Sequence, residues 1–203
     1  ETYVGALAHE AFHAYQGMEA PGRLAASEFA ASMEERYPWD DEVAEGAWQA
    51  ELDALHGAVE ASTDAEAARL ARQFLDRRAK RRDQQGLTDE LMAYERHWEW
   101  MEGLAKYAEL AIQRQPALDA GYEPVPAIDD DGDFHAYRDR ERYWRRQVNE
   151  INRLSGRSGH ARFYQSGFGQ AVLLDRFNPG WKARAFSEDV WLEDLLAEAL
   201  GSP

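Results

Sequence analysis

Two histidines four residues apart, with a glutamate between them, are the residues of this chain best suited to chemistry. The stretch His9-Glu10-Ala11-Phe12-His13 has the H-E-x-x-H pattern. In a helix, residues four apart lie one turn apart on the same face, so both imidazoles could bind one metal ion. Glu10 lies about 100° round the helix axis and could accept a proton from a metal-bound water. The pattern therefore predicts a metal-dependent hydrolytic site.

Such a site needs a third protein ligand, with one position left open for water. In the stretch "WEWMEGLAKYAEL", residues 98–110, Glu102 and Glu109 are seven positions apart and share one face of a helix. Their neighbours are largely aromatic or apolar, and a buried carboxylate is costly unless it is paired or bound to a metal. The two glutamates are therefore candidates for the site; the alternative is that both face water.

The two stretches together resemble the catalytic helices of the gluzincin zinc metallopeptidases, and in particular their aminopeptidase branch. In that branch an H-E-x-x-H helix is followed by an N-E-G-F-A-type helix whose glutamate is the third zinc ligand. The resemblance implies a zinc ion bound by His9, His13 and Glu102, with Glu10 as the general base. Glu109 matches an acidic residue that supports a zinc-bound histidine through its second ring nitrogen.

A third segment, "FYQSGFGQAVLLD" at residues 163–175, resembles the Y-x-x-G segment of the same families. By this resemblance Tyr164 donates a hydrogen bond to the oxyanion of the tetrahedral intermediate. The alternative role for Tyr164 is packing beside Phe163. Of the remaining histidines, His160 is the one expected to lie near the site. The chain departs from the family in two ways: residues 14–101 separate the two motifs, a much longer stretch, and no β-sheet precedes the first motif.

Apolar periodicity and helix-ending residues predict a mainly α fold with little or no β-sheet. We expect one mostly helical domain over residues 1–203, the helical catalytic portion of a zincin-like metallopeptidase. Thr63 and Thr88 are predicted helix N-caps, and the basic run "DRRAKRRDQQ" at 76–85 is predicted to be solvated. The expected segments are the H-E-x-x-H helix (1–20), a helical insertion (21–88), the E-G-L-A helix (89–115), a loop (116–135) and C-terminal helices (136–203).

Composition limits the partners of the chain. Its net charge of −15, from 23 basic and 38 acidic residues, argues against nucleic acid. No apolar run approaches the roughly 20 residues needed to span a bilayer, and the lack of cysteine excludes disulfides and thiolate ligands. The chain begins with Glu1, which indicates processing or excerpting, so we expect a preceding segment or domain. The compartment stays open; secretion or a periplasmic location would be compatible with processing.

The expected function is that of a zinc-dependent metallopeptidase-like hydrolase acting on a peptide or small amide substrate. One alternative is a catalytically inactive metallopeptidase-like protein or an acidic helical interaction domain. Another is a di-iron carboxylate bundle, in which Glu10 and His13 would act with Asp53 and His56. In that arrangement His9 would have no role.

Overall fold

A computed structural model describes residues 2–39, 42–119, 121, 123, 125–126, 140–153 and 159–201. Within these ranges every regular element is helical, which confirms the mainly α prediction. The elements are α1 (Thr2–Glu19), α2 (Pro21–Ala30), the 3₁₀ segment η1 (Ala31–Arg36), α3 (Glu42–Glu60), α4 (Asp64–Gln84), α5 (Asp89–Trp98), the π segment η2 (Glu99–Gly103), α6 (Leu104–Leu118), α8 (Arg140–Arg153), α9 (Ala161–Phe177), α10 (Trp181–Arg184) and α11 (Leu192–Leu200).

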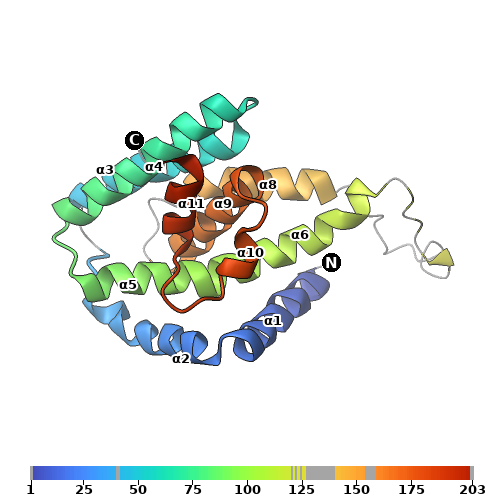
Figure 1. Cartoon of the computed structure of the whole chain (residues 1–203), viewed down its shortest axis with the longest axis horizontal. Helices are drawn as coiled ribbons and strands as arrows, with labels where there is room; N and C mark the ends of the chain where they lie inside the picture. The colour runs from blue at the N-terminus through green and yellow to red at the C-terminus, as the bar shows by residue number, and fades with distance from the viewer. Residues whose placement is uncertain are drawn as a thin grey trace.

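The continuous rod α5–η2–α6 is the centre of the arrangement (Figure 1). Helices α1 and α2 run along one side of the rod, and the hairpin of α3 and α4 lies on the other side. Helices α8, α9 and α11 fill the space between that hairpin and the rod. The first motif, on α1, and the Tyr164 helix, α9, therefore both pack on the element that carries Glu102.

Most helix boundaries follow from local signals. The Thr63 and Thr88 side chains accept hydrogen bonds from the backbone N–H groups of Glu66 (3.3 Å) and Leu91 (3.4 Å), so both act as N-caps, as predicted. The E-G-L-A helix extends to Leu118 and contains a π segment that was not predicted. The loop expected at 116–135 therefore begins later, and residues 120, 122, 124, 127–135 and 136–139 lie outside the described part of the chain.

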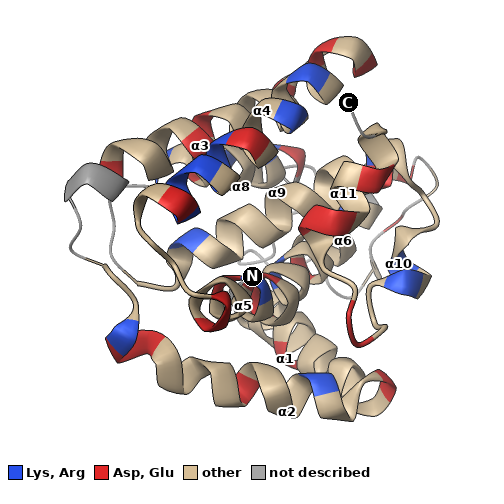
Figure 2. Ribbon diagram, turned by 60° about the vertical axis from the view of Figure 1, so that its left-hand side comes forward, with Lys and Arg blue, Asp and Glu red and all other residues tan. Residues whose placement is uncertain are grey.

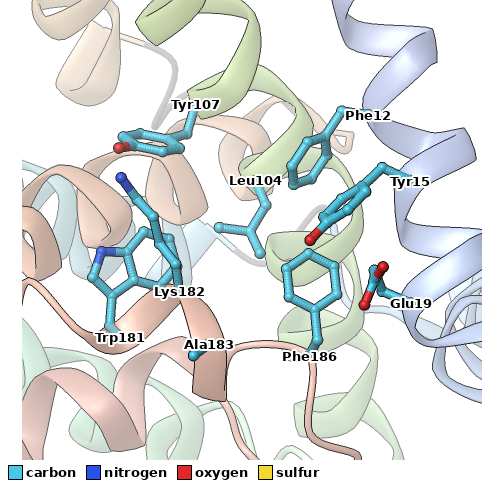
Figure 3. Close-up of a pocket in the computed structure, with 9 residues that line it drawn as sticks. All are labelled: Phe12, Tyr15, Glu19, Leu104, Tyr107, Trp181, Lys182, Ala183 and Phe186. Atoms are coloured by element: carbon cyan, nitrogen blue, oxygen red, sulfur yellow. The ribbon is translucent and has the colours of Figure 1, made fainter.

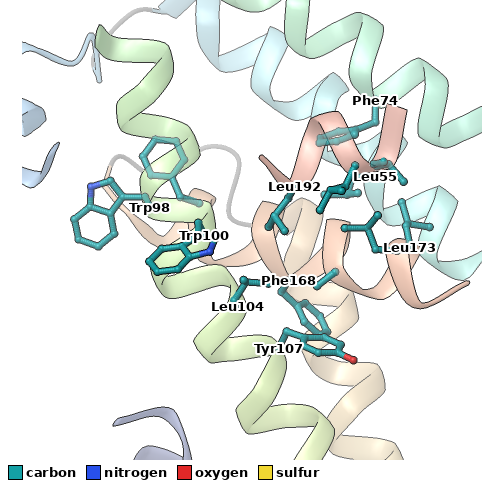
Figure 4. Packing of buried hydrophobic residues seen from close by; sticks show 14 of the residues in the cluster. Leu55, Phe74, Trp98, Trp100, Leu104, Tyr107, Phe168, Leu173 and Leu192 are labelled. Carbon is teal, nitrogen blue, oxygen red and sulfur yellow. The ribbon is translucent and has the colours of Figure 1, made fainter. Parts of the chain in front are cut away.

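The apolar core lies where the rod, α9 and the α3–α4 hairpin meet (Figure 4). Most of the side chains that form it are at most 3% exposed, so these are fully withdrawn from water and supply the main driving force for packing. They include Leu55, Phe74, Trp100, Leu104, Phe168, Leu173 and Leu192.

Backbone contact between η2 and α9 positions two of the motifs against each other. A Cβ atom on Gly103 would lie 2.6 Å from the Cα of Gly167, and one on Gly167 would lie 2.5 Å from the carbonyl oxygen of Glu99. No side chain fits at either position. The glycine after Glu102 and the glycine three residues after Tyr164 thus meet, and this contact brings the two functional candidates together.

The basic run at 76–85 was predicted to be solvated, and this prediction is wrong for three of its arginines. Each of the three is at most 7% exposed and donates to buried carboxylates of other helices. With the partly exposed Arg96, four arginines face four glutamates, so the charges of the network balance and each buried ion has partners. The members of this Arg–Glu network are Arg78, Arg81, Arg82, Arg96, Glu51, Glu95, Glu99 and Glu193.

The excess of acidic residues is spread over many helices and is not gathered on one element (Figure 2). Among the described residues, no helix combines the length and the apolar character that crossing a bilayer requires.

Candidate metal centre

Three of the predicted site residues come together between α1 and η2. The Nε2 atom of His9 lies 3.0 Å from Oε2 of Glu102, and Nε2 of His13 lies 3.4 Å from the same oxygen. One ligand atom from each residue lies within 4.8 Å of the other two. Within the described ranges no other set of three or more His, Cys, Asp or Glu residues is arranged so that it could hold a metal ion. All three side chains are partly buried. A small ligand can therefore reach them, while the surrounding protein strengthens their electrostatic interactions.

The π segment gives Glu102 its direction. In a regular α-helix, residues three apart share a face, yet Glu99 and Glu102 turn to different neighbours. Glu99 accepts hydrogen bonds from Arg78 of the Arg–Glu network, whereas Glu102 faces the two histidines. A π turn pairs residues i and i+5 and so has more residues per turn. We attribute the separation of the two carboxylates to this wider turn.

The second ring nitrogen of each histidine also has a partner. Nδ1 of His9 lies 3.6 Å from Oε2 of Glu109. Glu109 is the residue whose carboxylate was predicted to support one of the histidines. Nδ1 of His13 lies 2.8 Å from Oε1 of Gln16. Sequence reasoning missed Gln16, although its spacing of three residues after His13 on the same helix face was a usable signal. Both imidazoles therefore present Nε2 to the common point and Nδ1 to an orienting group.

Tyr164 stands beside the triad on α9. Its ring is stacked nearly parallel to that of His9, with centroids 6.1 Å apart, and its phenol is among the groups that lower the pKa of Glu102. Burial, together with Glu102 and Glu10, raises the pKa of Tyr164, so the phenol keeps its proton and acts as a donor. Glu10 is exposed, and its negative charge contributes to the raised pKa of Tyr164.

The centre is built to hold positive charge between two carboxylates. The hydrogen bond to Glu102 and the nearby carboxylate of Glu109 raise the pKa of His9 to about 9, against the opposing effect of burial. Glu102 raises the pKa of His13 in the same way. Burial would raise the pKa of Glu102, but its interactions with His13, His9 and Tyr164 hold it well below its usual range. The carboxylates thus favour positive charge at the point where the three ligand atoms converge.

The other sequence candidates lie elsewhere or at the edge of the site. Asp53 is exposed and accepts from Gln49, and the partly buried His56 lies 3.1 Å from Asn149. Among the described residues neither joins Glu10 and His13 in a group of ligands, as a di-iron site would require. His160 lies at the start of α9, one turn before Tyr164. Its ring stacks on Trp98 with centroids 3.8 Å apart, and the Trp98 ring lies 6.4 Å from that of Tyr164. It therefore lies near the site but outside the triad, among the aromatic side chains beside it.

A cavity of about 330 Å³ lies between α1, α6 and α10 (Figure 3). Its lining is mainly aromatic, and Lys182, at one end, is paired with Asp175 at 3.0 Å. Phe12 faces this cavity while its neighbour His13 faces the triad, so the two sites lie on different faces of α1. The aromatic lining residues are Phe12, Tyr15, Tyr107, Trp181 and Phe186.

Comparison of the chain with protein families, with curated proteins and with solved structures finds no match. Any functional conclusion therefore depends on the site itself.

Proposed function

We propose that this chain is a zinc-dependent hydrolase of peptide or small amide bonds, with a gluzincin type of centre. The convergence of His9, His13 and Glu102 carries the proposal. Ligand atoms at about 2.0–2.1 Å from a tetrahedral zinc lie about 3.3–3.4 Å from one another. The distances of 3.0 and 3.4 Å from Glu102 Oε2 to the two imidazole nitrogens are close to that spacing.

The donor set favours zinc in a catalytic role. Two imidazoles and one carboxylate leave a fourth position for water, as catalytic zinc sites do. When bound, zinc supplies a water whose pKa is lowered to about 7 and polarises the substrate carbonyl. Glu102 and Glu109 together carry two negative charges, which balance a divalent cation.

The remaining chemistry is assigned to Glu10 and Tyr164. Glu10 accepts a proton from the attacking water and passes it to the leaving nitrogen. Tyr164, which keeps its proton because its pKa is raised, donates to the carbonyl oxygen as that oxygen becomes an oxyanion. The same hydroxyl helps to lower the pKa of Glu102, which supports a place for it beside the ligand set.

The substitution Glu10→Gln tests this function. Glu10 is exposed and is not one of the three ligands, so the variant is expected to keep its zinc. Its hydrolysis of a mixed fluorogenic peptide library should fall by at least about 100-fold, because general-base catalysis typically contributes that much or more. Zinc content and turnover are measured on the same sample, with chelator-treated wild type as the control. Unchanged turnover in the variant would reject Glu10 as the base.

The same assay separates the proposal from its main alternative. Wild-type chain that binds one zinc ion and cleaves none of the library peptides would favour an inactive metallopeptidase-like or interaction domain. Two iron ions per chain by elemental analysis would favour the di-iron bundle.

A further inference from the structure

We infer that Gln16 is a positioning residue of the metal centre, holding His13 so that Nε2 faces the cation. Nothing in the sequence motifs assigns a role to Gln16. The inference rests on the proposed metal site, but it does not depend on whether that site hydrolyses peptides.

The contacts of the Gln16 amide determine its orientation. The side chain is fully buried, and its Nε2 atom donates to the backbone carbonyls of Trp100 (2.9 Å) and Met101 (3.2 Å). The reversed amide would place its oxygen against these two carbonyl oxygens, which is unfavourable. Oε1 is therefore the atom 2.8 Å from His13, and it can only accept.

This orientation also determines the tautomer of His13. Because Oε1 of Gln16 accepts, Nδ1 of His13 must carry the hydrogen. A neutral imidazole has one N–H group, so Nε2 then carries the lone pair. That nitrogen is the one 3.4 Å from Glu102, where the cation would be bound.

Gln16 also links the two halves of the centre. His13 belongs to α1, whereas Trp100 and Met101 belong to the π segment that carries Glu102. A single buried amide thus joins one ligand to the turn that positions another. His9 is oriented differently, by the carboxylate of Glu109. A neutral partner at His13 avoids a third negative charge beside a divalent ion, which favours an amide over a carboxylate at this position.

The test is zinc affinity, measured by competition with a chromogenic chelator. Gln16→Met keeps the length of the side chain and removes its hydrogen bonds; we expect zinc to bind about 10- to 100-fold more weakly, as for other partners of zinc ligands. Gln170→Met is the matched control. Gln170 is also fully buried, but its amide donates to the backbone of Ser166 and makes no contact with the triad. We expect its zinc affinity to stay within about twofold of wild type.

A spectroscopic measurement distinguishes positioning from general destabilisation. In the zinc-loaded chain, the Nδ1–H proton of His13 should be protected from solvent exchange and visible by NMR. It should be lost by exchange in Gln16→Met and kept in Gln170→Met. Wild-type affinity in Gln16→Met, or equal weakening in Gln16→Met and Gln170→Met, would overturn the inference.

The outcomes for Gln16 and for hydrolysis are separable. A wild-type chain that binds zinc without cleaving peptides removes the proposed function and leaves the role of Gln16 in place. Unchanged zinc binding in Gln16→Met, beside loss of turnover in Glu10→Gln, removes the role of Gln16 alone. A wild-type chain that takes up no zinc overturns both.

Discussion

Replacing Gly167 by alanine should damage both the stability of the chain and the proposed metal centre. The added Cβ would lie 2.5 Å from the carbonyl oxygen of Glu99 and 2.8 Å from the Cα of Gly103. Non-bonded carbon atoms pack best at about 3.5–4.0 Å, so α9 must move away from η2 by roughly 1 Å. Both opposing atoms are backbone and cannot rotate aside. The clash must therefore be relieved by separating the two helices.

The size of the effect follows from two opposing contributions. Overpacking typically costs about 1–3 kcal/mol, and the rigid contact at Gly167 places it near the upper end. Alanine is better than glycine inside a helix by about 1 kcal/mol. The net loss in free energy of unfolding is therefore about 2 kcal/mol, or roughly 4–8 °C in Tm for a chain of this size. A displacement of this size also moves Tyr164 away from Glu102, and misplacement by about 1 Å can cost 100-fold in turnover.

Thermal unfolding and peptide turnover of Gly167→Ala are compared with those of Gly46→Ala. Gly46 lies in α3, and a Cβ there would meet nothing within 4 Å. The control removes a glycine from a helix without a clash, so it should raise Tm slightly and leave turnover unchanged. If Gly167→Ala is as stable and as active as Gly46→Ala, the η2–α9 contact does not hold the centre together as argued.

Two further predictions concern the Arg–Glu network. Arg81→Met should lower the free energy of unfolding by about 3–5 kcal/mol in chemical denaturation, because it leaves buried carboxylates without a partner; the exposed Lys80→Met is the control, and equal stability of the two would contradict a buried network. The pKa of Glu95 is held at about 2, because Arg81 and Arg82 outweigh the effect of burial. Between its unfolded value near 4.5 and that pKa the unfolded chain binds more protons, so stability should be complete above about pH 5 and fall towards pH 2. Urea unfolding at pH 7, 5 and 3 measures this, and an unfolding free energy that is constant over the range would disprove it.

Much of the local structure could be predicted because it depends on neighbours within one or two helical turns. The pairing of His9 with His13 follows from a spacing of four residues, and the caps at Thr63 and Thr88 follow from their own hydroxyls. The mainly α character follows in the same way from apolar periodicity. For these features the sequence alone was sufficient.

Only some residues of the candidate site could be predicted from the sequence. Glu102 and Tyr164 were singled out by resemblance, but their approach to His9 depends on the packing of α1 and α9 against one rod. The π segment that directs Glu102 had no signal in the sequence, because a single wider turn leaves the apolar pattern almost unchanged. The spacing of Gln16 from His13 was a local signal, but the orientation of its amide depends on backbone carbonyls more than eighty positions away.

The clearest difference between sequence and structure is the basic run at 76–85. Its composition indicates a solvated surface, and the exposed Lys80 agrees with that. Whether Arg78 is buried depends on carboxylates supplied by three other elements, at Glu51, Glu99 and Glu193. A buried charge is tolerated only where such partners are already in place. The sequence alone therefore determined the helices and the histidine pair, while the tertiary structure decided which charges are buried and which side chains meet at the centre.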